Sequence, residues 1–413
     1  MKSRGLIILY ILLVWFAISF VTNLIGPLMP IIIQDFKLSL AMAGFLPFSF
    51  FLAYGLVSIP AGTLVETKGP RTALLLAFFL NLLGCVPIAL YPSYATAIAG
   101  LFIIGLGMAM LQVVINPLMR TAAGESRFAF YSVMGQLVFG LASFLSPWVF
   151  TKMMDAPEAA GKPLVWVAFY WAFLVLFIAL VAITTALRLP HVELNENEKT
   201  GGYAAYRTLL SDRSVRLFFL AIVAYVGTEQ SLANWMSQFL SDYHQFSPSS
   251  EGADAVGRFW GLMSIGCLLG LLLLKLLDSK VVLALFSVLA LISIGLALFG
   301  AAPVSLLAFP ATGFFLSVMF SIIFSLALNS RSDLHGAFSG ILCTGILGGA
   351  VLPLLVGVLG DWLGLRWAMT VVFATTAYIL SVCWWAKPMV TNETVSLKAL
   401  LGAKQAKHGL TVD

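Results

Sequence analysis

The sequence predicts an all-α membrane protein whose twelve transmembrane helices form two six-helix bundles. Three observations predict this fold class. Hydrophobic residues make up 61% of the 413 residues and charged residues only 10%, with a mean hydropathy of +1.00, whereas a soluble domain carries about 25% charged residues. Twelve apolar runs are long enough to span a bilayer, which takes about 20 helical residues. One long polar interruption divides the runs into two sets of six.

The apolar runs are separated by short connections that contain Pro, Gly or charged residues. Runs of this length are expected to be helices, because an open strand would leave backbone N–H and C=O groups unpaired in lipid. They are centred on Trp15, Leu52, Leu80, Gly107, Gly140, Leu174, Thr228, Gly266, Ala290, Leu316, Gly348 and Tyr378. The first run is far longer than the apolar core of a signal peptide, and no small-residue cleavage site closes it before Asp35, so we expect a retained span.

The polar interruption sets the expected domain boundaries. Residues 1–190 are predicted to form the N-terminal six-helix bundle, residues 191–213 a cytoplasmic linker, residues 214–387 the C-terminal six-helix bundle, and residues 388–413 a cytoplasmic tail. Within the linker, the segment that starts at Tyr203 is expected to form a short interfacial helix. Two bundles joined in this way suit a central site that is exposed alternately to either side.

The distribution of Lys and Arg predicts the orientation. With the N-terminus inside, all but five of the 23 basic residues fall on the cytoplasmic side, as the positive-inside rule requires. The five exceptions are Lys37, Lys152, Lys162, Arg258 and Arg366. We therefore expect a multi-pass protein of the inner (cytoplasmic) membrane with both termini in the cytoplasm. The net charge of +5 then reflects topology and contact with anionic lipid, and no nucleic-acid partner is expected.

Several functional classes are excluded by what the sequence lacks. It contains no Gly-rich phosphate loop, so transport cannot be driven by ATP bound to this chain. Its four histidines lie apart in loops, and no metal cluster or nucleophile–base pair is visible. No sizeable soluble module suggests a sensor. The sequence therefore predicts a transporter rather than an enzyme, with no cofactor and with a proton or sodium gradient as its energy source.

Glu229 is the one acidic residue at the middle of a predicted span. A carboxylate there costs roughly 3 kcal/mol, and such residues usually face a cavity or relay protons. No Lys or Arg lies at its depth, and burial without a cation favours the protonated acid. We expect Glu229 to be the proton-coupling residue. The alternative is a neutral Glu that steadies its helix through hydrogen bonds.

Neutral polar side chains on the predicted spans indicate a solute site. Amides both donate and accept hydrogen bonds, which suits an uncharged, hydroxyl-rich solute. An aromatic ring can stack on the apolar face of a sugar. The expected substrate-binding residues are Asn23, Gln112, Asn116, Gln136, Gln230, Asn234, Trp235 and Gln238. The alternative is that part of this set only bonds neighbouring helices to one another.

Specific segments resemble a known family. The loop after the second span runs from Gly62 to Arg71 as Gly-Thr-Leu-Val-Glu-Thr-Lys-Gly-Pro-Arg, which resembles the signature loop of the major facilitator superfamily. The segments Gly105–Pro117, Tyr225–Trp235, Gly313–Leu328 and Gly348–Pro353 resemble the fucose–galactose–glucose/proton symporter branch. The resemblance implies the major facilitator fold, sugar import and a monomer.

The resemblance also implies gating residues and reveals a departure. Glu66 and Arg71 of the signature loop are expected to lock neighbouring helices. Independently of the resemblance, Arg120 at the inner end of the fourth span is expected to pair with Glu66 or Glu125 as a gate. For Arg120 the alternative is an arginine that reaches the membrane interface. In the branch, an Asp in the first span and a Glu in the fourth carry proton coupling and sugar contact. The matching positions here are Asn23 and Gln112, which cannot titrate.

The predicted function is therefore import of a small neutral polar solute, most simply a hexose-like sugar, by proton symport with alternating access. An uncoupled facilitator and a sodium-coupled symporter remain alternatives because both family acids are replaced by amides. Drug export is disfavoured, because the segment Gly135–Pro147 matches poorly the Gly-Pro-containing signature of such exporters.

Overall fold

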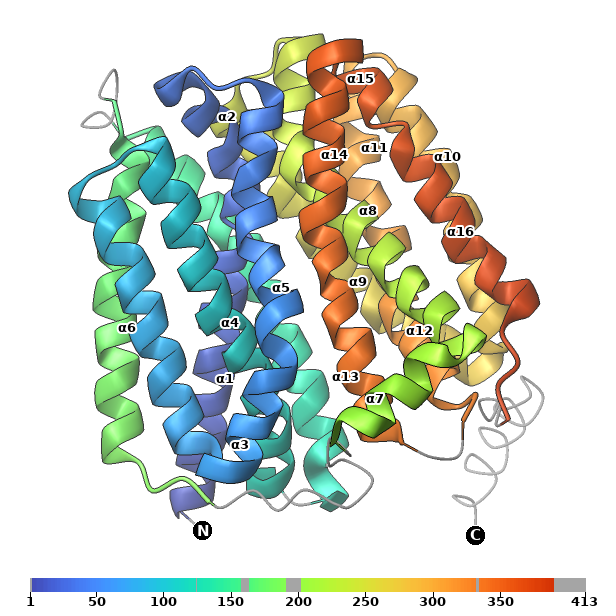
Figure 1. Ribbon diagram of the computed structural model, residues 1–413. Coiled ribbons are helices and arrows are strands. Elements are labelled where there is room, and N and C mark those ends of the chain that lie inside the picture. Colours follow the sequence, from blue (N-terminus) through green and yellow to red (C-terminus); the bar gives the residue numbers. More distant parts are fainter. Residues whose placement is uncertain (1, 124, 157–162, 191–201, 332–333, 390–413) are drawn as a thin grey trace, which may run out of the picture.

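The computed structural model describes residues 2–123, 125–156, 163–190, 202–331 and 334–389. All regular elements within these ranges are helices, and none is a strand. Figure 1 shows the first and last halves of the chain as two helical bundles that stand side by side. The predicted all-α class with two bundles is confirmed.

Twelve helical segments in the described ranges are long and apolar enough to cross a membrane. Each contains one of the twelve predicted centres. They are Arg4–Phe36, Leu40–Val65, Thr67–Leu90, Tyr94–Ala123, Met134–Met154, Val165–Ala186, Arg213–His244, Pro248–Leu276, Ser279–Phe299, Ala302–Leu328, Ala337–Leu363 and Leu365–Trp385.

The first bundle is built from α1 to α6. Its elements are α1 (Lys2–Thr22), α2 (Ile25–Phe36), α3 (Leu40–Leu90), α4 (Tyr94–Ala123), α5 (Glu125–Met154), η1 (Val165–Val167) and α6 (Ala168–Ala186). The first span breaks between α1 and α2, because Pro27 lacks an N–H and its ring clashes with the carbonyl four residues earlier. The long α3 contains the second and third spans, which meet at Gly69.

The second bundle contains α8 to α16, and some of its spans are divided between two helices. Its elements are α8 (Arg213–His244), η3 (Pro248–Gly252), α9 (Ala253–Leu276), α10 (Ser279–Phe299), α11 (Ala302–Leu316), α12 (Met319–Leu328), α13 (His335–Thr344), η4 (Gly345–Leu347), α14 (Gly348–Leu363), α15 (Leu365–Ala368) and α16 (Val371–Trp385). Asp212 and Asp278 accept the N–H groups of Ser214 and Lys280, which caps the starts of α8 and α10.

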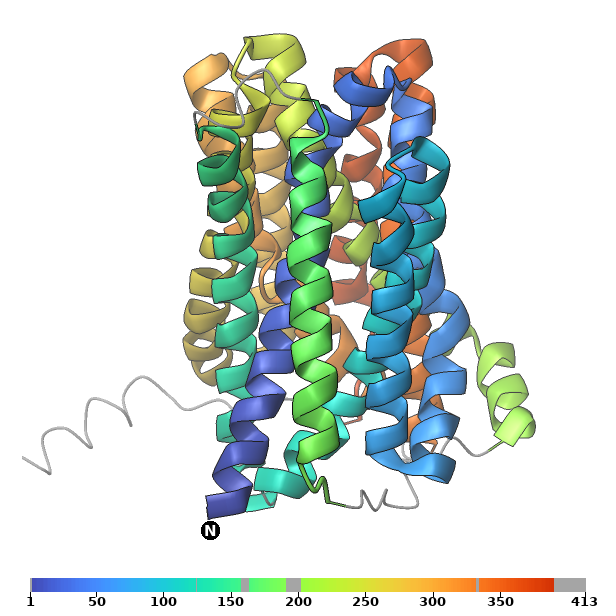
Figure 2. The ribbon, with the colours of Figure 1, turned by 90° about the vertical axis from the view of Figure 1, so that its left-hand side faces the viewer.

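A short helix, α7 (Gly202–Ser211), lies between the bundles in the sequence, where an interfacial helix was predicted. It packs on α13 and α8. Figures 1 and 2 show it outside both bundles, toward the end of the molecule that carries the N-terminus. Residues 191–201 of the predicted linker and the predicted tail from residue 390 lie outside the described residues, so the proposed domain boundaries stay predictions.

The two bundles contact each other closely at the far end, meaning the end opposite the N-terminus, where α2 and α15 lie (Figure 1). The Asp361 carboxylate of α14 accepts the backbone N–H groups of Leu40 and Ala41, at 2.8 and 2.9 Å. The Ser39 hydroxyl accepts the next N–H, that of Met42, at 3.2 Å. The first N–H groups of a helix have no partner within the helix. Those of α3 are therefore satisfied in part by the opposite bundle.

The signature loop contains a turn at Gly69 whose backbone conformation can be tested by mutation. Gly69 has φ 80° and ψ 165°, a region that is essentially restricted to glycine and costs other residues about 1–3 kcal/mol. An added Cβ would meet nothing within 4 Å, so any penalty comes from the backbone. We expect Gly69→Ala to lower the free energy of unfolding by about that amount, seen as a lower melting temperature in detergent.

Gly5→Ala is the matched control for that variant. A Cβ at Gly5 also meets nothing within 4 Å, but Gly5 lies in the helical α1, where alanine is the better helix former. Its melting temperature should stay the same or rise. Equal melting temperatures for the two variants would contradict a strained turn.

The capping of α3 by Asp361 generates a second prediction. Asp361→Ala leaves two N–H groups without their carboxylate, and loss of a helix cap costs about 1 kcal/mol. The control is Asp254→Ala, which makes the same charge change but removes a carboxylate that is exposed and pairs with Arg258 one helical turn away. Such pairs contribute about 0.3–0.5 kcal/mol. Melting curves should show the larger loss for Asp361→Ala, and the reverse order would refute the cap.

Candidate functional site

Glu229 lies in the middle of α8, partly buried, with a hydrogen-bond donor on each carboxyl oxygen. The Tyr225 hydroxyl donates to Oε2 at 2.6 Å, and the Gln230 Nε2 donates to Oε1 at 3.0 Å. Among the described residues no Lys or Arg forms an ion pair with this carboxyl group. A hydroxyl both donates and accepts. Tyr225 can therefore donate to the carboxylate and accept from the protonated acid, so its contact with Glu229 survives either state.

Another face of α8 is fixed to two other helices of the second bundle, α14 and α16. The Trp235 indole N–H donates to the Pro353 carbonyl of α14 at 2.9 Å. The Thr228 hydroxyl lies 2.6 Å from that of Thr375 in α16. These contacts set the rotation of α8. As a result, Gln230 and Asn234, one helical turn apart, face the first bundle, and the Asn234 Nδ2 lies 3.5 Å from the Gln230 Oε1.

These two amides belong to a small pocket between the bundles, which we call the seam pocket. It is too tight to admit a water molecule in this conformation, and it is lined by Thr22, Asn23, Gly26, Gln230, Ala233, Asn234, Val256 and Trp260. The walls come from α1 and α2 on one side and from α8 and α9 on the other. Three residues predicted from the sequence to bind the solute, Asn23, Gln230 and Asn234, therefore meet here.

The seam pocket is narrow because α2 and α8 approach each other without an intervening side chain. A Cβ at Gly26 would lie 2.6 Å from the Ala233 carbonyl oxygen, far inside van der Waals contact. Only glycine allows the two backbones to come so near. Separation of α2 and α8 would therefore widen the pocket.

Asn23 is held in place by its own bundle. Its Nδ2 donates to the Ser19 carbonyl at 3.0 Å and to the Ser143 hydroxyl of α5 at 2.9 Å. The Ser19 and Ser143 hydroxyls lie 2.7 Å apart. The described residues provide no donor to the Asn23 Oδ1. The amide is thus oriented with its nitrogen occupied and its oxygen available as an acceptor.

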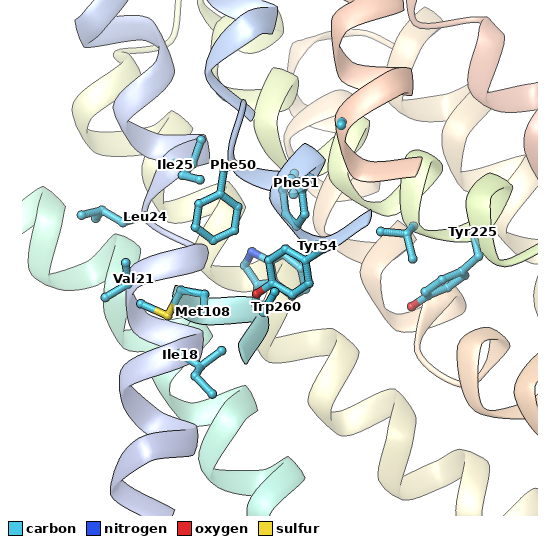
Figure 3. Close-up of a cluster of buried hydrophobic side chains, with 14 of the residues drawn as sticks. Ile18, Val21, Leu24, Ile25, Phe50, Phe51, Tyr54, Met108, Tyr225 and Trp260 are labelled. Atoms are coloured by element: carbon cyan, nitrogen blue, oxygen red, sulfur yellow. The ribbon is translucent and has the colours of Figure 1, made fainter. Parts of the chain in front are cut away.

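Aromatic side chains of α3 border this region. Figure 3 shows Phe50, Phe51 and Tyr54 of α3 in one cluster of buried side chains with Trp260 and Tyr225. The Phe50 and Phe51 rings pack edge to face, with centroids 5.0 Å apart. The Tyr54 hydroxyl lies beside Thr22, which lines the seam pocket. The site therefore combines amides with aromatic rings.

The remaining predicted solute-binding residues lie elsewhere. Gln112 is half-buried on α4, and Gln136 is exposed on α5. Trp235 is fully buried against α14 and its N–H is already bonded. Gln238 donates to Asp242 near the far end of α8, at 2.7 Å. The Asn116 side chain lies outside the part that the structure describes. For these five residues a role in binding stays a prediction.

The predicted gating residues are described only in part. The Arg71 Nη2 donates to the Thr185 carbonyl at the end of α6, at 2.6 Å, which fastens the turn of α3 within its own bundle. The side chains of Glu66 and Arg120 lie outside the described part. A role of these three residues in gating stays a prediction.

Sequence reasoning missed three features of this region. One is the hydrogen bond from Tyr225 to Glu229, which the spacing of four residues could have indicated because it places both on one helix face. Ser143 carries no local signal for its contact with Asn23. Nothing in the sequence links Asp361 to the start of α3, whose N–H groups it accepts.

Comparison of the sequence with protein families and with known proteins identifies membrane transporters as its relatives. The Major Facilitator Superfamily model matches residues 11–344. The chain is 30% identical over 396 residues to a glucose/galactose transporter of Brucella abortus, covering 92% of this chain and 93% of that protein. It is 26% identical over 394 residues to the L-fucose-proton symporter of Escherichia coli, covering 88% and 89%.

Solved structures show the same fold. The E. coli transporter FucP in the outward conformation superposes with a TM-score of 0.68 at 20% identity, covering 94% of this chain and 100% of FucP. A bacterial homologue of Spinster in the inward-facing, unoccupied conformation gives 0.70 at 14% identity, covering 93% and 97%. At these identities the likeness establishes the fold alone.

Proposed function

The chain belongs to the major facilitator superfamily, and from this premise we propose that it imports a small neutral polar solute, a hexose-like sugar, by proton symport. It is a multi-pass membrane transporter and not an enzyme. The observation that carries the proposal is the seam pocket, where amides of both bundles meet. One of them, Gln230, is adjacent in sequence to Glu229 and donates to its carboxyl group, which has no cationic partner among the described residues.

The character of the pocket supports a sugar as the solute. Its polar groups are neutral amides, and aromatic rings lie at its border. Sugars present hydroxyl groups that both donate and accept, together with an apolar ring face. The related proteins of B. abortus and E. coli are named for glucose, galactose and fucose. Among the pocket residues, none is a Lys or Arg that would bind an anionic solute.

The way the bundles meet supports alternating access. The excess of Lys and Arg at the N-terminal end supports a cytoplasmic location for that end in the inner membrane. The far end then faces outward. In the described conformation the bundles are joined there through Asp361 and through the approach of Gly26 to α8. For a solute to enter from outside, these contacts separate and the seam pocket opens.

Glu229 is the proposed proton carrier. It takes a proton from the outer side when the bundles part at the far end, and it releases that proton to the cytoplasm after the solute has crossed. Gln230 donates to Glu229 and also contacts Asn234 in the pocket. A change in the charge of Glu229 thereby alters the hydrogen bonds of Gln230, which lines the solute site. Asn23 and Gln112 cannot titrate and so cannot share this task. Asp35, at the far end of the first span, accepts hydrogen bonds from Leu164 and Trp166.

Glu229→Gln tests the coupling. The amide keeps the size and hydrogen-bonding capacity of the side chain but cannot carry a proton. In proteoliposomes, sugar accumulation driven by a pH gradient should vanish, while exchange of labelled for unlabelled sugar continues. The control is Asp242→Asn, the same chemical change three to four helical turns farther along α8, which should retain accumulation. Gradient-driven accumulation by Glu229→Gln would refute the assignment.

Ligand-dependent stabilisation tests the solute and the ion. A ligand that binds only the folded protein increases its free energy of unfolding, by about 2.7 kcal/mol at a concentration one hundred times Kd, and so raises the melting temperature. D-glucose, D-galactose and L-fucose should each be measured at pH 5.5 and pH 7.5, with and without sodium. We expect stabilisation by at least one hexose that is greater at the lower pH. Stabilisation that requires sodium, or that only non-sugars produce, would contradict proton–sugar symport.

A further inference from the structure

We propose that Trp260 is a solute-binding residue whose indole N–H donates a hydrogen bond to the transported solute when the seam pocket opens. This inference rests on the proposed function of the pocket as the solute site and adds a residue and a specific contact to it. The evidence is the unusual state of this indole in the closed pocket.

Trp260 is a buried donor without an acceptor. The residue is only 5% exposed, and its Nε1 has no hydrogen-bond partner among the described residues. Two other buried indoles in the same protein are satisfied: Trp166 donates to the Asp35 carboxylate at 2.8 Å, and Trp235 donates to the Pro353 carbonyl at 2.9 Å. Buried indole N–H groups usually find a partner. The unpaired N–H of Trp260 therefore lowers the stability of this conformation and is free to bond an added acceptor.

The neighbours of Trp260 explain why the donor stays unused. The Gln230 amide is occupied at both ends, by Glu229 and by Asn234. The Asn23 Oδ1 is an available acceptor, but it forms no hydrogen bond with the indole in this conformation. The closed pocket has no room for a water molecule that would accept the bond. A hydroxyl-bearing solute that enters when the pocket widens can supply the acceptor that Trp260 lacks in this conformation.

The position of Trp260 favours the transported solute as that acceptor. Trp260 belongs to α9 of the second bundle, whereas Asn23, in the same pocket, lies in the turn between α1 and α2 of the first. The indole supplies only a donor, and the Asn23 Oδ1 supplies only an acceptor. A hydroxyl-bearing solute between them accepts from one bundle and donates to the other. A donor fixed in position before binding loses little entropy when the bond forms.

The test compares two tryptophans that differ in the use of their N–H. Trp260→Phe and Trp166→Phe remove the same ring atoms from buried sites, but only Trp166 loses an existing hydrogen bond. The measurements are the ligand-free melting temperature and the Kd for D-glucose, D-galactose or L-fucose, whichever binds the wild-type protein. We expect Trp260→Phe to raise Kd about tenfold, equivalent to 1.4 kcal/mol. Trp166→Phe should leave Kd within about twofold and lower the melting temperature more.

The outcomes separate this inference from the proposed function. If the wild-type protein binds none of the three sugars, the proposed function fails and the role of Trp260 fails with it. If the wild-type protein binds but Trp260→Phe has an unchanged Kd, only the role of Trp260 is refuted. Should Trp260→Phe not fold, Trp260→Tyr replaces it, and an unchanged Kd would again refute the proposal.

Mono-deoxy analogues of the sugar that binds give an independent measure. Removal of the hydroxyl that accepts from Trp260 should weaken binding to the wild-type protein about tenfold, but should weaken binding to Trp260→Phe little further, because the contact is already lost. Equal losses in both proteins for every analogue would refute a direct contact.

Discussion

The structure depends on one constraint: inside a bilayer, a polar group must find its partner within the protein. For the backbone this constraint is met by helices, whose N–H and C=O groups bond internally. The ends of helices and the polar side chains within spans are the exceptions, and the architecture is organised around them. At the start of α3, two N–H groups are satisfied by Asp361 from the opposite bundle. A local requirement of one helix thereby becomes a contact between bundles.

The same constraint distinguishes structural polar groups from those that suit a functional role. Ser19, Asn23 and Ser143 bond one another and fasten α1 to α5. Thr228 and Thr375 do the same for α8 and α16. The seam pocket differs, because among the described residues the Trp260 N–H and the Asn23 Oδ1 have no hydrogen-bond partner there. Groups left unpaired where two bundles meet are costly in the closed form, and they become useful when a solute supplies the missing atoms.

Because Asn23 and Gln112 cannot titrate, the proposed coupling is concentrated on α8. Glu229 lies one residue from Gln230 and four from Tyr225, so the acid, a hydroxyl that tolerates both protonation states and a pocket amide share one helix. Such an arrangement needs no second acid to connect proton and solute. It also makes the rotation of α8, fixed by Trp235 and Thr228 against the second bundle, decisive for the site.

Hydropathy and residue periodicity determined the all-α class, the twelve spans, the isolation of Glu229 and the helix that starts near Tyr203, because each depends on segments short enough to read locally. The resemblance of the signature loop identified the family. Only the tertiary structure decided which polar residues meet. It brought Asn23 together with Gln230 and Asn234, and it turned Trp235 toward α14. It also placed Asp361 of α14 against the start of α3, 320 residues or more away in sequence. Contacts between bundles depend on how helices rotate and pack, and no local pattern encodes that.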